Sequence, residues 1–273
     1  MLTKDPIAII AFEGWNDAGE AASAALDHLI TAFTAEKIFT FDPEPYYDFQ
    51  VNRPMIRTLA SGLKRVEWRT TDMYKAALKS GQILYMIRGI EPSMHWRQFT
   101  NEILDQLRNH EVSLVISLGA LLSDTPHTRP IPVTPVALSS EIAANFQIEL
   151  SDYEGPTGIL GVIQESLITT EIPGLSLWAA VPHYVSQPPS PKASLALLDA
   201  LENLIDIPIP IDEFESRVES WTRQVNDLVE TDEEMQDYVR RLEIEGDSYQ
   251  LPIASGETIA QEFERYLRRR DSK

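Results

Sequence analysis

The sequence has 273 residues with 42 acidic and 23 basic side chains, which gives a formal net charge of −19, and it contains no cysteine. A charge of this size repels nucleic-acid phosphates and anionic membrane surfaces, so we expect neither nucleic acid nor a membrane as a partner. The lack of cysteine excludes disulfides, thiolate metal sites and cysteine nucleophiles.

The first part of the chain alternates strand and helix patterns. Ile7–Phe12 is an unbroken apolar run, typical of a strand that is buried on both faces. Apolar residues at helical spacing follow from Ala18 to Phe33, and Lys37–Phe41 is a further short strand. Residues 42–70 are rich in Pro, Tyr and Arg, and they predict either a long excursion or a small antiparallel hairpin.

The same alternation continues to about residue 205. The predicted strands are Gln82–Ile87, Val112–Leu118, Thr134–Leu138 and Leu175–Val181, and the predicted helices are Met94–Asn109, Gly158–Thr170 and Pro191–Ile205. Buried strands that alternate with helices predict a mostly parallel sheet with helices on both faces. The fold class is therefore α/β.

Charge and proline divide the chain near residue 210. Residues 1–210 hold 25 acids and 14 bases, whereas residues 211–273 hold 17 acids and 9 bases. The junction Ile207–Ile211 contains two prolines, which favour an extended connector. We therefore expect an α/β core domain at residues 1–210 and an acidic helical subdomain at residues 211–273.

Three apolar stripes at helical spacing occur in the C-terminal part. They comprise Phe214, Val218, Trp221, Val225 and Leu228; Met235, Tyr238, Val239 and Leu242; and Ile259, Phe263, Tyr266 and Leu267. Such stripes usually pack on one another or on the main domain. The sequence shows no signal peptide and no apolar stretch near ~20 residues, so we expect a cytoplasmic protein without a membrane span.

Unusual residues gather in the loops that follow four of the predicted strands. If those strands are parallel, the loops lie together at the carboxyl edge of the sheet, where α/β proteins bind ligands. The residues of this candidate loop rim are Glu13, Trp15, Asn16, Asp17, His95, Arg97, Asp124, His127, Arg129, His183 and Tyr184. We call this set the loop rim, and it is the candidate site for any ligand or reaction.

The loop rim fits none of four common catalytic or cofactor-binding motifs. Gly14 and Gly19 have the spacing of a phosphate loop, but Glu20 and Ala21 stand where lysine and a hydroxyl residue are required. The dinucleotide-binding, nucleophile-elbow and zinc motifs are also absent. We therefore assign no catalytic residue and expect no cofactor and no metal. Asn16 or Asp17 is also a typical cap for the helix that follows.

Residues 51–70 are locally basic in an otherwise acidic protein. The basic side chains are Arg53, Arg57, Lys64, Arg65 and Arg69. They form either a solvated face or a surface that meets the acidic C-terminal helices of a neighbouring subunit.

Six segments of the chain resemble the actinobacterial branch of the proteasome assembly chaperone 2 (PAC2) family. They are Phe12–Ala25, Asp42–Pro54, Gly89–Arg97, Leu118–Val133, Tyr153–Gly161 and Leu177–Lys192, and the closing segment Ser255–Arg270 resembles the same group. The resemblance implies a three-layer α/β/α sandwich of the phosphorylase or hydrolase type, and a homo-oligomer, most simply a trimer. It supplies no catalytic residue.

The resemblance also indicates protein partners. Eukaryotic and archaeal members assist the assembly of proteasome rings, in several cases through a C-terminal hydrophobic–Tyr–any tripeptide. This chain ends in Arg270-Asp271-Ser272-Lys273 and has Tyr266 at an internal position, so docking through such a tail is not expected.

Two functions are consistent with these observations. The first is a non-enzymatic assembly chaperone or scaffold that acts through its surfaces as a homo-oligomer, with proteasome subunits or another protein as partners. The alternative is a small-ligand-binding protein or an enzyme of the phosphorylase or hydrolase type that uses the loop rim. The first is favoured because every catalytic motif tested is missing.

Overall fold

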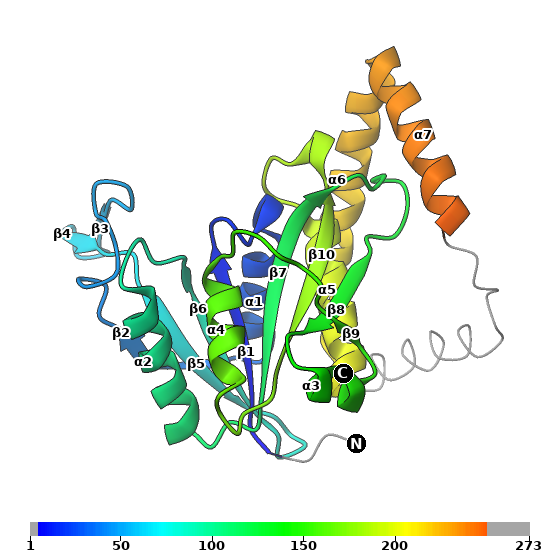
Figure 1. Cartoon of the computed structure of the whole chain (residues 1–273). Helices are drawn as coiled ribbons and strands as arrows, with labels where there is room; N and C mark the ends of the chain where they lie inside the picture. The colour runs from blue at the N-terminus through cyan, green and yellow to red at the C-terminus, as the bar shows by residue number, and fades with distance from the viewer. Residues whose placement is uncertain (1–4, 250–273) are drawn as a thin grey trace.

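The computed structural model describes residues 5–249, and Figure 1 shows the order of the elements. The strands are β1 (Ile7–Glu13), β2 (Glu36–Phe41), β3 (Met55–Thr58), β4 (Lys64–Glu67), β5 (Thr71–Ala77), β6 (Ile83–Ile90), β7 (Leu114–Ser123), β8 (Val133–Ala137), β9 (Glu149–Leu150) and β10 (Gly174–Pro182). The α-helices are α1 (Ala21–Ala32), α2 (Trp96–Asn109), α3 (Ser140–Phe146), α4 (Ile159–Leu167), α5 (Pro191–Ile205), α6 (Asp212–Glu230) and α7 (Glu233–Tyr249).

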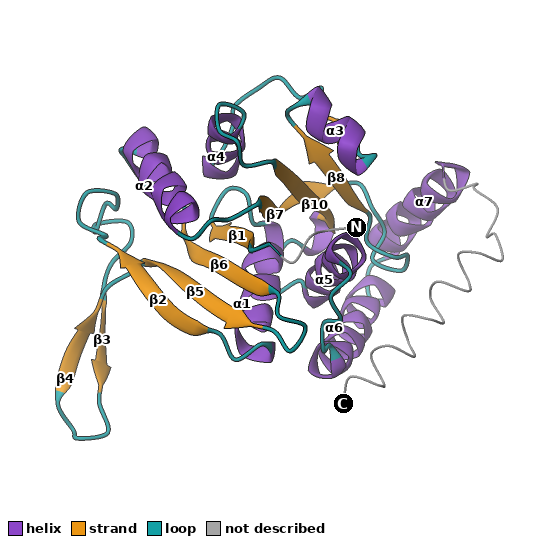
Figure 2. Ribbon diagram, turned by 90° about the horizontal axis from the view of Figure 1, so that it is seen from below, coloured by secondary structure: helices purple, strands orange, loops and turns teal. Residues whose placement is uncertain are grey.

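An eight-stranded sheet in the order β2-β5-β6-β1-β7-β10-β8-β9 forms the centre of the protein (Figure 2). The four central strands β6, β1, β7 and β10 are parallel to one another. Strands β5 and β8, on either side of them, run antiparallel to their inner neighbours. The parallel core confirms the predicted α/β class, and the antiparallel strands lie only toward the edges.

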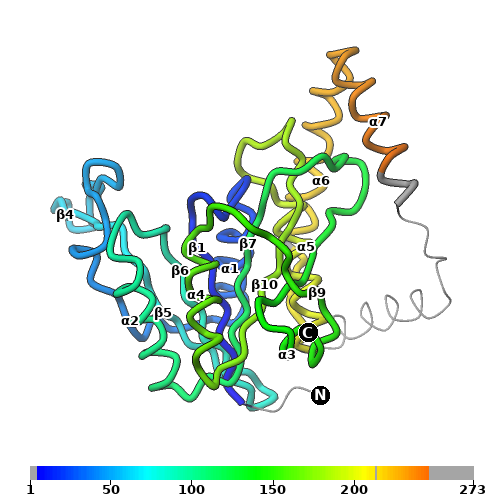
Figure 3. The backbone as a smooth tube through the Cα atoms, viewed as in Figure 1, coloured from blue at the N-terminus to red at the C-terminus, as the bar shows by residue number. Residues whose placement is uncertain are grey.

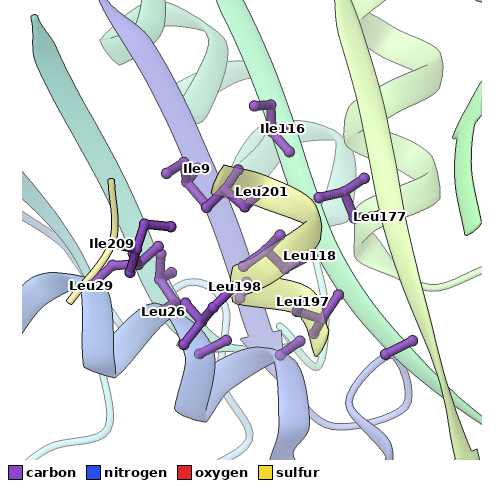
Figure 4. Close-up of a cluster of buried hydrophobic side chains, with 14 of the residues drawn as sticks. Ile9, Leu26, Leu29, Ile116, Leu118, Leu177, Leu197, Leu198, Leu201 and Ile209 are labelled. Atoms are coloured by element: carbon purple, nitrogen blue, oxygen red, sulfur yellow. The ribbon is translucent and has the colours of Figure 1, made fainter. Parts of the chain in front are cut away.

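Helices cover both faces of the sheet, which makes the fold a three-layer α/β/α sandwich. Alternate residues of β1 point to opposite sides, so Ile9 packs with α1 and α5 while Ile10 packs with α2 and α4. Figure 4 shows the first of these two clusters, where Leu201 of α5 lies beside Ile9 and Leu198 of α5 lies beside Leu26 of α1. Central strands with two buried faces explain the unbroken apolar runs in the sequence.

The excursion at residues 42–70 contains the predicted antiparallel hairpin. Strands β3 and β4 pair with each other and with no other described strand. Strand β5, helix α3 and strand β9 were not predicted. Strand β5 was missed because Asp72 and Lys75 interrupt its apolar pattern, and α3 and β9 are too short for a clear period.

Helix α6 packs on α5 of the main body, and α7 packs on α6 (Figure 3). In the connector before them Ile209 and Ile211 are buried, whereas Pro208 and Pro210 are exposed. Phe214 of α6 joins the same core as α1 and α5. A second, smaller cluster joins Val225 of α6 and Val239 of α7 to Val185. Most of the first two predicted stripes therefore pack as expected, except that Leu228 is exposed and Val229 is buried in its place. The stripe at 259–267 lies outside the described residues.

Candidate functional site

All four parallel strands end at the same edge of the sheet, as the sequence predicted. The loop rim consequently lies along one edge. Its eleven residues do not meet at one point. They divide into separate groups according to the strand that each follows, and most of them make specific contacts with other parts of the fold.

Asp17 caps helix α1. Its Oδ1 accepts hydrogen bonds from the backbone N–H of Ala22 at 2.7 Å and of Ser23 at 3.2 Å, which confirms that one residue of the Asn16-Asp17 pair is the cap. The side chain is buried, and its Oδ2 has no hydrogen-bond partner among the described residues. Burial raises the pKa of this carboxyl group to about 6.

Glycines shape the loop between β1 and α1. Gly14 has a φ of +120° and Gly19 a φ of +61°, and residues other than glycine rarely adopt this backbone conformation. A Cβ on Gly19 would lie 2.7 Å from the Cβ of Ser190, at the start of α5. Gly19 therefore allows the loop to touch α5, and it serves packing rather than phosphate binding.

Glu13 belongs to a charge network on the opposite side of the sheet from α2. Its Oε1 accepts from Arg88 Nη2 at 2.8 Å, and Arg69 pairs with its other oxygen. Arg88 also contacts Asp27 of α1 through two hydrogen bonds of 2.9 and 3.1 Å. Because both of its carboxylate oxygens are in ion pairs, Glu13 connects β1 to Arg69 and Arg88 rather than presenting a free carboxylate to a ligand.

Asn16 lies in a second network that joins β1, β6 and α4. Its Nδ2 donates to Glu91 Oε1 at 3.1 Å, and the same oxygen accepts from the backbone N–H of Ile159 at 2.8 Å. A carboxylate at the start of α4 is stabilised by the unpaired N–H groups there. Glu91 was not among the predicted site residues, although it stands directly after a strand.

His127 and Tyr184 connect the loops after β7 and β10 to helix α6. The Tyr184 hydroxyl lies 2.7 Å from His127 Nδ1, and it also accepts the backbone N–H of His127 at 2.7 Å. Nε2 lies 2.9 Å from Asn226 Oδ1, so Nε2 carries the proton and donates to Asn226. Lys192 donates to the His127 carbonyl oxygen. Burial lowers the pKa of His127, and the ring is neutral at neutral pH.

The contacts of His127 predict a loss of stability in acid. Because its folded-state pKa lies below the ordinary value of about 6.5, the unfolded chain binds more protons as the pH falls below that value. Between about pH 7.5 and about pH 5.5 the melting temperature of the wild type should therefore decrease relative to that of His127→Gln, because the opposite contribution of Asp17, whose pKa is raised, is common to both proteins. A loss of about 1 kcal/mol corresponds to about 2–4 °C in a domain of this size. Equal pH slopes in the two proteins would contradict this expectation.

The remaining rim residues of these two loops contact helix α7. His183 Nδ1 lies 3.1 Å from Asp124 Oδ1, and the Tyr238 hydroxyl donates to the same oxygen at 3.0 Å. Arg129 pairs with Glu243 at 3.4 Å. The five rim residues that follow β7 and β10 thus hold the helical pair α6–α7 against the sheet edge.

His95 and Arg97 stand apart from the other rim residues. Both are exposed at the start of α2, and their side chains make no hydrogen bond or ion pair with any residue in the described range. Trp96 between them packs against the α2–α4 cluster and donates to the Pro92 carbonyl oxygen at 2.6 Å. The three predicted rim histidines therefore do not form one site.

A groove of about 1200 Å³ opens beside the rim. It runs over β7, β10, β8 and β9 on the face of the sheet that carries α4, and Trp178 of β10 lies in its wall. Four rim residues line it: Trp15, Asn16, Asp124 and Arg129. The groove is open and largely apolar, which suits a protein segment as well as a small molecule.

Sequence reasoning missed the helical residues that contact the rim. Asn226 is 99 residues from His127, and Tyr238 is 114 residues from Asp124. No local pattern links positions so far apart, because only the packing of α6 and α7 brings them together. Among residues 5–249, no group of three His, Asp or Glu side chains could hold a metal ion, and no helix is apolar and long enough to cross a membrane.

Comparison with known proteins identifies the family. The model of the PAC2 family matches residues 11–229. The chain belongs to the PAC2 family. No curated protein matches this PAC2 chain.

Solved structures agree with this assignment. A PAC2 family protein from Streptomyces avermitilis is 47% identical, covers 86% of this chain and 100% of its own, and has a TM-score of 0.80. A proteasome-assembly chaperone homologue from Mycobacterium tuberculosis is 42% identical, with coverage of 85% and 99% and a TM-score of 0.77. The archaeal proteasome activator PbaB of Pyrococcus furiosus, at 15% identity, coverage of 82% and 93% and a TM-score of 0.66, shares the fold alone. The Streptomyces and Mycobacterium structures confirm the predicted actinobacterial branch of the family.

Proposed function

We propose that this PAC2 protein is a non-enzymatic assembly chaperone or scaffold that acts through its surfaces in the cytoplasm. Its partners are proteasome subunits and further copies of itself, most simply in a trimer. Its α/β core at residues 1–210 supplies the scaffold, and the acidic subdomain at 211–273 adds a charged surface.

The observation that carries this proposal is the apolar surface left open on the protein. Trp15, Leu121 and Leu122 are exposed at the groove, and the β3–β4 hairpin exposes further apolar side chains. Open apolar surface of this kind marks a protein contact. The 42% identical relative described as a proteasome-assembly chaperone homologue supports the same function.

Affinity capture tests the chaperone function. The tagged full chain should enrich proteasome subunits and unfinished assemblies from a native extract of its source organism, compared with the tag alone. A deletion strain should accumulate unassembled subunits, measured on native gels. Capture at the level of the tag-only control, together with normal proteasome assembly in the deletion strain, would refute the chaperone function.

A second function, small-ligand binding by the loop rim, is favoured by the groove itself. Asn16, Asp124 and Arg129 place polar groups on a mostly apolar lining, which is the usual composition of a ligand site. However, a volume of about 1200 Å³ exceeds that of most small-molecule pockets, which measure about 300–1,000 Å³. The size therefore favours a polypeptide.

A thermal-shift screen separates the two functions. Nucleosides, inorganic phosphate and small organic acids are the probes that a phosphorylase-like or hydrolase-like site would bind. A ligand at about one hundred times its dissociation constant stabilises a protein by about 2.7 kcal/mol. A shift that disappears in Arg129→Ala would favour the ligand site, whereas an unchanged melting temperature with every probe would favour the chaperone.

A further inference from the structure

The β3–β4 hairpin has no packing partner among the other described residues of its chain. All eight residues of its two strands are exposed, and Figures 1 and 2 show it projecting from the body of the protein. An isolated two-stranded hairpin is only marginally stable in water. A further surface is therefore needed to hold this one in place.

The side chains of the hairpin indicate which kinds of side chain the partner surface presents. Ile56 and Val66 are cross-strand neighbours, and they are 68% and 45% exposed. Arg57 and Arg65 also stand opposite each other, and like charges in this position destabilise a hairpin. Arg57 pairs with Glu67 at 3.1 Å, whereas no ion pair of Arg65 occurs among the described residues. Because side chains alternate between the two faces of a strand, Ile56 and Val66 share a face with Lys64, whereas Arg57 and Arg65 lie on the other face. The face that carries Ile56, Val66 and Lys64 thus fits a surface that is both apolar and acidic.

The groove over β7, β10, β8 and β9 has these properties. Its apolar lining includes Leu121, Leu122, Leu138 and Leu150, which are all exposed. Its acidic lining residues are Asp124, Glu149 and Asp152. The only basic lining residue in the described range is Arg129, which already pairs with Glu243 of α7. The neighbouring α6–α7 segment, residues 214–245, adds ten acids against four arginines.

A hairpin cannot reach the groove of its own chain. It leaves the sheet between β2 and β5, at one end of the strand order, whereas the groove lies at the other end (Figure 1). Two complementary surfaces at opposite ends of one chain give head-to-tail contacts. Such contacts form a ring where the rotation between neighbouring copies closes, and an open filament where it does not.

We propose that the β3–β4 hairpin of one copy docks into the groove over β7, β10, β8 and β9 of a second copy, with Ile56 and Val66 against the groove leucines and Lys64, on the same face of the hairpin, toward the groove acids. This interface rests on the self-association in the proposed function, and it defines the two surfaces that form it. Repeated around a ring, each chain gives one hairpin and receives one.

Light scattering of matched variants tests this interface. Ile56→Glu places a charge on the hairpin and Leu122→Glu places one in the groove, and both positions are exposed, so folding should be retained. The control Ile168→Glu lies at the end of α4, outside both surfaces, and is 52% exposed, the same as Leu122. Wild type and Ile168→Glu should show a multiple of 30.8 kDa, and the two interface variants a single 30.8 kDa chain.

Mixing the two interface variants gives the sharper result. The Leu122→Glu chain keeps an intact hairpin and the Ile56→Glu chain keeps an intact groove, so a mixture should form a dimer, twice 30.8 kDa, and no larger species. A mixture that stays monomeric, or a full oligomer in either single variant, would overturn this interface while the chaperone function could still stand. A monomeric wild type would overturn the self-association as well.

Cysteine cross-linking provides an independent readout. The chain has no native cysteine, so a thiol-reactive cross-linker reports only on introduced positions. An Ile56→Cys chain mixed with a Leu122→Cys chain should give a covalent dimer, whereas Ile56→Cys mixed with Ile168→Cys should not. Equal yields from the two mixtures would contradict the proposed contact.

Discussion

Replacing Phe99 by alanine should lower the free energy of unfolding by about 3–5 kcal/mol. Phe99 of α2 is fully buried, and three aromatic rings surround it: Tyr46 with its centroid at 5.0 Å, and Phe12 and Phe41 at 5.8 Å. Alanine would leave a cavity where α2, β1 and the loop after β2 meet, and the rigid rings around it cannot collapse to fill the space. Urea unfolding measures the loss.

The matched control for this substitution is Phe39→Ala. Phe39 lies on β2 at the edge of the sheet and is 37% exposed, so its removal should cost clearly less than that of Phe99. At about 2–4 °C per kcal/mol, Phe99→Ala should also lower the melting temperature by about 6–20 °C. Similar losses in the two variants would show that the aromatic cluster on the α2 side is not the packed core that the structure indicates.

The second large effect is expected at Gly89, where alanine should destabilise the protein by about 1–3 kcal/mol. A Cβ on Gly89 would lie 2.1 Å from Thr71 Oγ1 and 3.0 Å from the Thr71 Cα, so the backbone of β5 must move. The Thr71 hydroxyl lies 2.6 Å from the Tyr47 hydroxyl, which donates to the Ile90 carbonyl oxygen at 3.1 Å. The substitution should therefore also disturb the hydrogen bonds of Tyr47 with Thr71 and Ile90, which hold the segment that carries the hairpin against the sheet.

A double-mutant cycle checks this explanation. Because Thr71→Ala removes the oxygen that meets the new methyl group, Gly89→Ala should cost less in the Thr71→Ala background than in the wild type. Thermal unfolding of the four proteins gives the coupling energy. Strict additivity would mean that Gly89 is required for a reason other than its contact with Thr71.

Much of the fold could be predicted because the pattern that marks each central strand lies within the sequence of that strand. A strand buried on both faces must be apolar throughout, so Ile7–Phe12 could be recognised without knowledge of its neighbours. Helix α5 begins at Pro191 and ends at Ile205, as predicted, because proline at the first turn and a regular apolar spacing mark it. Strand β5 escaped prediction because only one of its faces is well buried.

The sequence predicted where the candidate site lies, at the carboxyl edge of the sheet, but it did not predict which side chains contact one another there. Parallel strands end at one edge, so the loops that carry Glu13, His95, His127 and His183 had to share that edge. Which side chains contact one another depends on helices far away in the sequence. Asn226 of α6 reaches His127 only because α6 packs against the loop after β7.

The sequence by itself determined the α/β class, a mostly parallel sheet, a cap at Asn16 or Asp17 and the acidic character of the C-terminal part. These features follow from local periodicity, from capping chemistry and from a simple count of charges. Only the tertiary structure decided that Glu13 and Asp124 are held in internal contacts, and that a basic hairpin and an acidic groove lie at opposite ends of the sheet. Those facts depend on long-range packing, which brings residues together through the whole core and leaves no trace in any short stretch of sequence.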